Sequence, residues 1–326
     1  MAYDATPGQG SAPAVRVGDP QPYHRLLRNS RSQWWTPILG SLTILAGWMF
    51  TSVLILSIQM AIRVDPKGTV SWFGLLATNL SLTVLIPLSI LVARLLNHQR
   101  PGLLSSVAGR LRWRPLAWFA LAALTLEVLL LAVVEVGGVN LLGNSGGGPA
   151  KDAAAVIAVT LLTSTFQAAG EEYFFRGYLL QTVGSMVRSP LVAILITTVL
   201  FTMAHGVWPW QSPALFLDRF AFGLVAAFLV VRTGGLEASI AAHAANNVVT
   251  FVFAALTNSV GDSLQATDAP WSLVFVDVAK FVVFGVIAIM IARWQRLETT
   301  ADPSVQLTPG PGPGARPGVG PGQRLV

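Results

Sequence analysis

The chain of 326 residues is 53% hydrophobic and only 11% charged, whereas soluble domains carry roughly a quarter charged residues. This composition excludes an ordinary soluble globule and indicates a polytopic membrane protein. The sequence contains no cysteine, which excludes disulfides, thiolate metal sites and cysteine nucleophiles. The formal net charge of +6 comes from basic residues that flank apolar stretches. That pattern is typical of membrane topology and not of nucleic-acid binding.

Apolar runs of the length that crosses a bilayer, about 20 residues, recur along the chain. They predict an all-α fold, a polytopic membrane helical bundle with about eight transmembrane helices, at 34–62, 70–93, 116–141, 153–186, 190–207, 213–232, 235–258 and 271–292. The first run follows a polar stretch without a small-residue cleavage site, so we expect a retained anchor.

The composition changes along the chain predict a division into five regions. These are a polar cytoplasmic N-terminal tail (1–33), three transmembrane helices with a basic cytoplasmic loop (34–149), a core that carries the polar motifs described below (150–255), the last external loop and helix (256–296), and a Pro/Gly-rich disordered tail (297–326). Residues 103–114 are too short and too basic to cross the bilayer. We expect them to lie along the inner leaflet.

The distribution of basic residues predicts the orientation, because cytoplasmic loops are enriched in Lys and Arg. With the N-terminus inside, the external loops hold only Arg63, Lys67 and Lys151. The cytoplasmic segments hold Arg16, Arg25, Arg28, Arg31, Arg94, Arg100, Arg110, Arg112, Arg114, Arg188, Arg232, Arg293, Arg296, Arg316 and Arg324. We therefore predict a multi-pass protein of the cell membrane with both termini in the cytoplasm.

Three predicted spans carry polar motifs, AAGEEYFFRGY at 168–178, LFTMAHG at 200–206 and ASIAAHAANNVV at 238–249. Ionisable groups inside a membrane are costly, so each is a candidate for function. Glu171 lies as far before Arg188, at the turn between two spans, as His205 lies after it. Antiparallel helices would therefore place both at one depth. His243 and Asn247 are four residues apart and share a helix face.

The two adjacent glutamates have different geometric partners. Glu172 and Arg176 have the spacing of an ion pair along one helix, whereas Glu171 points about 100° away around the axis. We therefore expect Glu172 and Arg176 to form a supporting ion pair while Glu171 faces a cavity. Asn246, next to Asn247, is expected to bond to a neighbouring helix.

These residue types favour the activation of water. A carboxylate beside a histidine can take a proton from water, and a histidine with an amide can stabilise the oxyanion formed at a peptide carbonyl. The set predicts a peptidase without a covalent intermediate. Alternatively, Glu171, His205 and His243 could be ligands of a catalytic zinc. The zinc-peptidase helix pattern, with two histidines four residues apart around a glutamate, is absent, so no cofactor is favoured and zinc stays the alternative.

The three motifs in this order resemble the signature of the CPBP intramembrane proteases. That family includes the eukaryotic Ras-converting CAAX endopeptidase and bacterial relatives linked to bacteriocin processing or self-immunity. The resemblance implies an α-helical membrane endopeptidase whose site lies within the bilayer and opens towards the cytoplasmic side. Carried over by motif, Glu171 and His205 would activate water, and His243 and Asn247 would stabilise the oxyanion.

The partners that follow are membrane lipid and a membrane-associated or lipidated protein or peptide substrate, with no nucleic acid and with the oligomeric state left open. Two other classes compete with an endopeptidase. One is a non-catalytic membrane scaffold or bacteriocin-immunity protein that keeps the motifs. The other is a proton-coupled transporter, for which Glu127 is the best starting point, since it has no obvious partner in sequence. Glu135 shares its helix face, and Asp277 and Lys280 are expected to neutralise each other.

The positions of the motifs along their helices also predict a shape. Glu171 lies about 25 Å from Arg188, but His243 lies only about 12 Å from Gly235, where its helix should begin. If they share one site, the hairpin around Arg188 must project roughly 13 Å further into the cytoplasm than Gly235.

Overall fold

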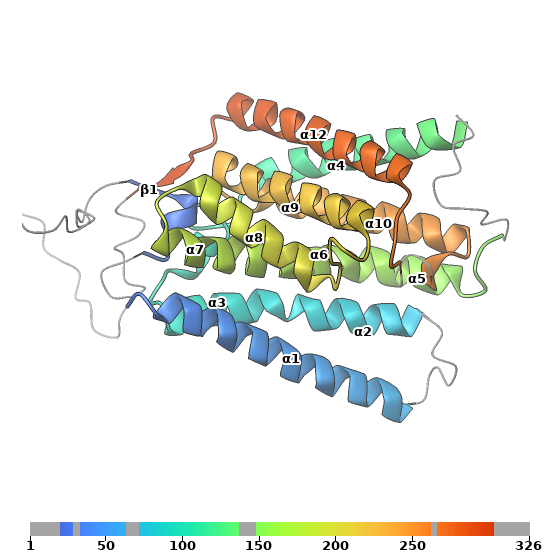
Figure 1. Ribbon diagram of the computed structural model, residues 1–326, viewed down its shortest axis with the longest axis horizontal. Coiled ribbons are helices and arrows are strands. Elements are labelled where there is room, and N and C mark those ends of the chain that lie inside the picture. The colour runs from blue at the N-terminus through green and yellow to red at the C-terminus, as the bar shows by residue number, and fades with distance from the viewer. Residues whose placement is uncertain (1–19, 29–32, 63–71, 137–147, 262–265, 303–326) are drawn as a thin grey trace, which may run out of the picture.

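The protein is a bundle of long helices that run roughly side by side (Figure 1). The structure, a computed structural model, describes residues 20–28, 33–62, 72–136, 148–261 and 266–302. Its α-helices are α1 (Thr36–Ile62), α2 (Trp72–Thr83), α3 (Leu85–Leu95), α4 (Trp113–Val136), α5 (Ala153–Val159), α6 (Thr165–Glu172), α7 (Leu180–Met186), α8 (Pro190–Ala204), α9 (Pro213–Thr233), α10 (Glu237–Leu256) and α12 (Trp271–Trp294). The shorter elements are the 3-10 turns η1 (Tyr23–Arg25) and η2 (Pro101–Leu104), the π-helical stretches η3 (Thr160–Ser164) and η4 (Tyr173–Leu179), and the strands β1 (Gln21–Pro22) and β2 (Thr300–Ala301).

The helices confirm the prediction of a polytopic all-α membrane protein. Within the described residues, seven helices are long and apolar enough to cross a membrane, with α2 and α3 forming one of them and α5 to α7 another. The fifth predicted span, 190–207, is different, because α8 has only 15 residues. At 1.5 Å per residue it is about 22 Å long, shorter than the roughly 30 Å of a hydrocarbon core.

The helix from Ala153 to Met186 is the longest in the described chain, with 34 residues. Its length of about 51 Å exceeds the bilayer core by about 20 Å. The long helix passes the start of α10 at Gly177. A methyl group added to Gly177 would lie 3.6 Å from Leu236 Cδ1, in the residue just before α10. From Gly177 to Arg188 the chain extends about 16 Å further along the helix axis. By this estimate the hairpin between α7 and α8 projects about 16 Å beyond the start of α10, compared with the roughly 13 Å that the sequence predicts.

A cap of short segments surrounds this projecting hairpin. Strands β1 and β2 pair in antiparallel fashion and so join residues near the two ends of the chain. Gly184 lies so close to the backbone of η1 that an added methyl group would come within 1.8 Å of the His24 carbonyl oxygen. Residues 20–28 and 297–302 fall within the ranges predicted as tails, yet Tyr23, Leu27 and Ala301 are fully buried.

The loop after α3 is part of this cap and packs against the protein. Leu103, Leu104 and Val107 are almost completely buried inside the protein. Backbone hydrogen bonds hold the loop to the α9–α10 turn, from Val107 N to Gly234 O (2.8 Å) and from Leu236 N to Ser105 O (2.9 Å). For Leu103, Leu104 and Val107 the predicted contact with the inner leaflet is wrong, because protein covers these side chains, whereas Trp113 at the end of the segment is 70% exposed.

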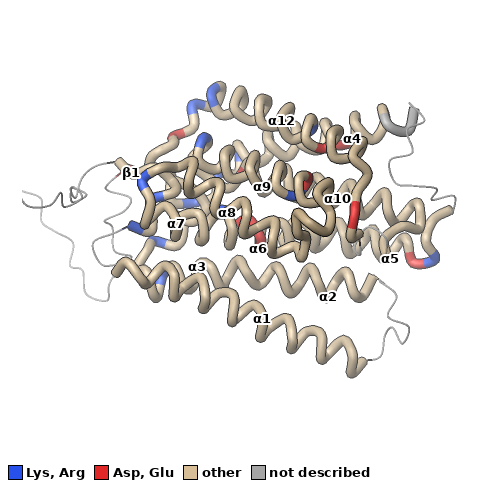
Figure 2. Tube along the Cα trace, viewed as in Figure 1, with Lys and Arg blue, Asp and Glu red and all other residues tan. Residues whose placement is uncertain are grey.

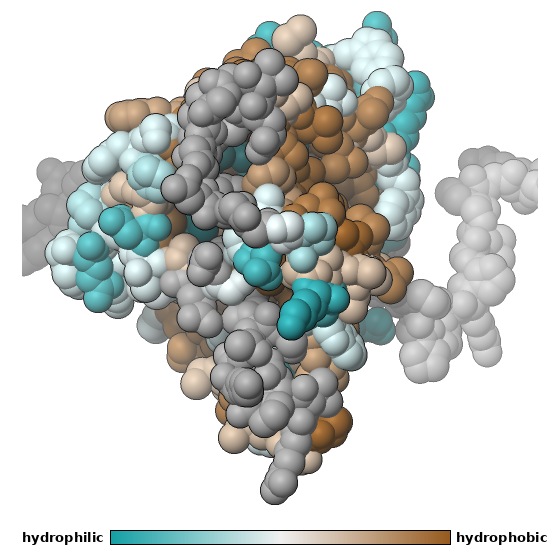
Figure 3. All heavy atoms as spheres, turned by 90° about the vertical axis from the view of Figure 1, so that its right-hand side faces the viewer, coloured by the Kyte–Doolittle hydropathy of each residue, from teal (hydrophilic) through white to brown (hydrophobic). Residues whose placement is uncertain are grey.

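The charges follow the predicted asymmetry between the two ends of the bundle. Most Lys and Arg residues gather at the end where α7 and β1 lie (Figure 2). The opposite end, viewed in Figure 3, shows both hydrophobic and hydrophilic side chains. The many exposed apolar side chains on α1, such as Phe50 and Met60, suit a surface that faces lipid.

A buried ion pair fastens the cap to the bundle. Arg112 is bidentate on Glu237, with Nε to Oε1 at 2.9 Å and an Nη to Oε2 at 2.6 Å. It also donates to the Thr233 carbonyl oxygen at 3.0 Å. Glu237 is 0% exposed and Arg112 7%. Removing one partner would leave the other charge buried without compensation.

We predict that Glu237→Gln lowers the unfolding free energy by about 3 to 5 kcal/mol, the usual cost of breaking a buried pair. The matched control is the double variant Arg112→Met/Glu237→Leu, which removes both charges and should recover most of the loss. Thermal unfolding in one detergent measures both. A single variant as stable as the wild type would show that the pair does not hold the cap.

Candidate active site

The first motif lies at the junction of α6 and the π-helical stretch η4. Glu171 and Glu172 are the last residues of α6. Gly170 lets this turn approach the backbone of α2, since an added methyl group would come within 2.1 Å of the Leu82 carbonyl oxygen. A π-helical turn inside an α-helix is uncommon and occurs often at functional sites.

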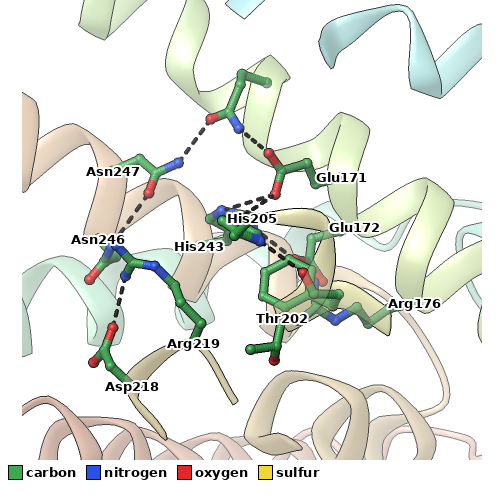
Figure 4. Close-up of polar contacts among 12 residues, drawn as sticks. Glu171, Glu172, Arg176, Thr202, His205, Asp218, Arg219, His243, Asn246 and Asn247 are labelled. Atoms are coloured by element: carbon green, nitrogen blue, oxygen red, sulfur yellow. Dashed lines mark hydrogen bonds and ion pairs between the residues drawn. The ribbon is translucent and has the colours of Figure 1, made fainter. Parts of the chain in front are cut away.

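The structure brings the predicted site residues together from three helices (Figure 4). His205 caps the C-terminal end of α8, and His243 and Asn247 lie on α10. The Glu171 Oε2 atom lies 3.9 Å from His205 Nε2 and 3.8 Å from His243 Nε2. The side chains of Glu171 and His243 are 9% and 8% exposed, whereas that of His205 is 30% exposed. The group therefore opens to the surroundings at His205.

The two oxygens of Glu171 differ in their surroundings. Oε1 accepts a hydrogen bond of 2.7 Å from Gln167 Nε2, one turn earlier on the helix. Oε2 is buried and has no hydrogen-bond partner among the described residues. The separations of 3.8 and 3.9 Å from the histidines are too long for direct hydrogen bonds. They suit a small molecule such as water that bonds to the carboxylate and to a histidine together.

Hydrogen bonds on the far side of each imidazole ring fix which nitrogen faces Glu171. His205 Nδ1 lies 2.9 Å from the Phe201 carbonyl oxygen, and His243 Nδ1 lies 2.8 Å from Glu172 Oε1. Both oxygens are acceptors, so each Nδ1 carries the hydrogen. Each Nε2 is thereby directed at Glu171, and in a neutral ring this nitrogen can accept a proton.

The predicted ion pair of Glu172 with Arg176 is present and buried. An Arg176 Nη lies 2.8 Å from Glu172 Oε1, with the two side chains 2% and 0% exposed. The Arg176 guanidinium also lies 3.8 Å from the centre of the Phe201 ring, a cation–π contact. Because Glu172 bonds to His243 as well, this pair holds the imidazole in place.

Gln167 is a site residue that the sequence analysis did not identify. It accepts a hydrogen bond of 2.8 Å from Asn247 Nδ2 and donates one to Glu171, so it joins α10 to α6. The available signal was its position, four residues before Glu171 in a span with few polar residues. The Asn247 amide keeps a second N–H for another acceptor.

The other charges inside the bundle form a second group around Lys280 on α12. Its Nζ lies 2.8 Å from Asp277 Oδ1, which confirms the predicted pairing, and 3.1 Å from Glu127 Oε1. Glu127, which has no obvious partner in sequence, therefore has one on another helix, and the reason for choosing it as the starting point of a proton path no longer holds. Asp218 pairs with Arg219 at 2.8 Å. The side chain of Glu135 lies outside the described residues.

Zinc does not fit the side chains as they are arranged. Within the described part of the chain, no group of three or more His, Cys, Asp or Glu side chains could hold a metal ion. Ligands at 2.0 to 2.2 Å from one tetrahedral ion lie about 3.3 to 3.6 Å from each other, closer than the 3.8 and 3.9 Å observed between Glu171 and the histidines. No catalytic step below uses a metal.

The fold and site together define a multi-pass helical membrane protein with a buried glutamate–histidine centre. Residues 153–249 match the family model described as type II CAAX prenyl endopeptidase Rce1-like. The chain is also 35% identical over 108 residues to the uncharacterized protein YyaK of Bacillus subtilis (strain 168). That match covers 32% of this chain and 36% of the relative, so the chain spans about a third of the relative's length. The family match confirms the resemblance for residues 153–249.

We predict that Glu172→Gln destabilises the protein more than Glu171→Gln does. The first substitution leaves the buried Arg176 without its carboxylate, at a cost of about 3 to 5 kcal/mol, whereas the second removes a charge whose facing atom has no direct partner. Thermal unfolding of both purified variants measures the difference. The double variant Glu172→Gln/Arg176→Gln is the control and should be more stable than Glu172→Gln alone. Equal melting temperatures for the two single variants would contradict a structural role of the pair.

Proposed function

We propose that the protein is an intramembrane endopeptidase of the CAAX-processing type, which hydrolyses a peptide bond of a membrane-associated substrate with water activated by Glu171 and His205. The observation that carries the proposal is the position of Glu171 Oε2, buried and 3.8 to 3.9 Å from the Nε2 atoms of two histidines. The match to an endopeptidase family over residues 153–249, which include every proposed catalytic residue, supports it.

The reaction begins with a water molecule that donates hydrogen bonds to Glu171 Oε2 and His205 Nε2. Glu171 takes the proton as the water oxygen attacks the scissile carbonyl carbon. The C–N bond then breaks as the same proton passes to the leaving nitrogen, which gives a carboxylic acid and an amine. The acid then gives its proton to the amine, so the final products are a carboxylate and an ammonium group. His205 keeps the water aligned, and its fixed Nδ1–H leaves Nε2 as an acceptor.

The oxyanion that forms during attack needs hydrogen-bond donors. His243 in its protonated form supplies Nε2–H, and Asn247 supplies the N–H that Gln167 does not use. With His243 protonated, the formal charges of Glu171, Glu172, Arg176 and His243 sum to zero. A buried group of ionised residues is least costly in a membrane when its charges cancel.

The short helix α8 gives a substrate its way to the site. Because α8 ends at Ala204, the next residue, His205, lies at the open end of the helix with its side chain 30% exposed. A peptide segment in the membrane or at its surface can approach Glu171 from this edge. We propose a lipidated or otherwise membrane-associated protein or peptide as substrate, the cell membrane as location and a cytoplasmic position for both termini, in agreement with the basic end of the bundle (Figure 2).

We predict that Glu171→Gln abolishes cleavage, because the substitution keeps the size of the side chain and removes the base. The loss should be about a hundredfold or more in kcat. The assay uses a farnesylated peptide with a C-terminal CAAX sequence in lipid vesicles, and its unprenylated counterpart tests whether the lipid matters. Comparison of peptide ends in membranes of cells that carry the wild type or Glu171→Gln extends the test to natural substrates.

The matched control is Glu237→Gln, a second buried glutamate, which pairs with Arg112 and lies outside the proposed site. Its kcat, measured on folded protein, should stay close to that of the wild type. Products that form equally with wild type and Glu171→Gln would contradict the mechanism. A biological effect that survives the Glu171→Gln substitution would instead favour a membrane scaffold or immunity protein.

We predict that the purified protein keeps its activity after strong chelation, because the proposed steps need only side chains and water. Metal content is measured by elemental analysis beside turnover of the same peptide. Stoichiometric zinc, with activity that is lost on its removal and restored on its return, would reverse the assignment. Glu171, His205 and His243 would then be its ligands.

A further inference from the structure

A continuous chain of hydrogen bonds joins the charge group on α12 to the proposed catalytic glutamate. Lys280 Nζ donates to Asn246 Oδ1 at 2.9 Å, and Asn246 Nδ2 donates to Asn247 Oδ1 at 3.4 Å. Asn247 Nδ2 donates to Gln167 Oε1 at 2.8 Å, and Gln167 Nε2 donates to Glu171 Oε1 at 2.7 Å. Figure 4 shows the links through Asn246, Asn247 and Glu171. Asn246 thus bonds to a neighbouring helix, as predicted.

The two ends of this chain give it a direction. The ammonium group of Lys280 can only donate hydrogen bonds, and an ionised carboxylate can only accept them. Each of the three amides between them can in principle be turned round, which exchanges its donor and its acceptor. With a donor fixed at one end and an acceptor at the other, only one orientation of all three amides makes every bond.

We propose that Lys280 and Asn246 are positioning residues for the reaction: through Asn247 and Gln167 they hold the Glu171 carboxylate with Oε2 towards the histidines. The same bonds aim the spare N–H of Asn247 at the oxyanion. This inference rests on the proposed function of Glu171. It also assigns a role to the other charged residues around Lys280, because Glu127 and Asp277 hold the Lys280 ammonium group in place.

The burial of the chain supports a fixed orientation. The Lys280 side chain is 6% exposed and that of Glu127 is 11% exposed, and Gln167 is 6% exposed. Water cannot readily replace a lost partner of Lys280 or Gln167, so a Gln167 amide turned the wrong way would leave polar atoms unpaired, whereas Asn246 and Asn247 are partly buried. The network therefore favours one arrangement of its donors, and this arrangement ends at Glu171.

The substitution Asn246→Asp tests the direction of the chain. An aspartate of the same size still accepts from Lys280 but cannot donate to Asn247 Oδ1. The Asn247 and Gln167 amides would then turn round, and Gln167 would present its oxygen to the Glu171 carboxylate. We expect kcat for the farnesylated peptide to fall roughly tenfold, the size typical of coupling through a chain of packed side chains. KM should stay unchanged, because no residue of the chain before Asn247 touches substrate.

The matched control is Asn79→Asp on α2, which is 2% exposed. Asn79 donates to the hydroxyl groups of Thr163 and Ser164 at 2.8 and 3.1 Å, and hydroxyls can rotate to donate instead. This variant also adds a carboxyl group inside the bundle, but it should keep the kcat of the wild type. Equal losses of kcat in both variants, or an unchanged kcat in Asn246→Asp, would overturn the proposal.

A thermal double-mutant cycle tests the chain without any activity. A glutamine at position 171 can donate as well as accept, so it tolerates the reversed chain. Asn246→Asp should therefore lower the melting temperature of the wild type clearly more than that of Glu171→Gln. Equal decreases in both backgrounds would show that the two positions are not coupled and would overturn the proposal. The cleavage assay tests the proposed function separately. If the wild-type protein cleaves no peptide while the thermal cycle still shows coupling, the proposed function fails but the hydrogen-bond chain stands.

Discussion

The buried carboxylate of Glu172 is the feature on which the site depends, because it holds a positive charge in the membrane and an imidazole in position at once. Its Oε1 atom lies 2.8 Å from Arg176 and 2.8 Å from His243 Nδ1. Placing ionised groups within a bilayer is costly unless they pair. The pairing therefore favours the arrangement in which the long helix and α10 meet at this depth. Glu171, the next residue, is directed at the opposite nitrogen of His243.

The rest of the fold brings this layer together and closes it on one side. The Ala153–Met186 helix is too long for the bilayer core, and the cap covers its projecting end with β1, β2, η1 and the loop after α3. Arg112 and Glu237 fasten the cap to the start of α10, about two turns before His243. On the other side, α8 stops at Ala204 and leaves the site accessible at His205. A closed end and an open edge suit a site that binds a segment from the membrane.

Much of the fold was predictable from sequence, because apolar run length and the cost of intramembrane charge are strong constraints. The runs gave the helices, and the equal distances of Glu171 and His205 from Arg188 placed the two residues side by side. The burial of Leu103, Leu104 and Val107 was not predicted, since an apolar and basic segment has the same sequence pattern whether lipid or protein covers it. The partner of Glu127 was missed for a related reason: Lys280 lies on another helix, and sequence spacing reports only contacts within one helix. Gln167 was missed because an uncharged amide gives little signal until its neighbours are known. The roles of Glu171, His205, His243 and Asn247 remain proposals.

The most direct measurement of whether water attacks the peptide bond itself is a single turnover in oxygen-18-labelled water, with protein in excess over the farnesylated peptide. Direct attack by a water that Glu171 activates places one labelled oxygen in the new carboxylate of the product from the first turnover. If a carboxylate of the protein attacked instead, the first-turnover product would carry an unlabelled oxygen taken from that side chain. Labelled product is the predicted result, and unlabelled product from the first turnover would contradict the mechanism.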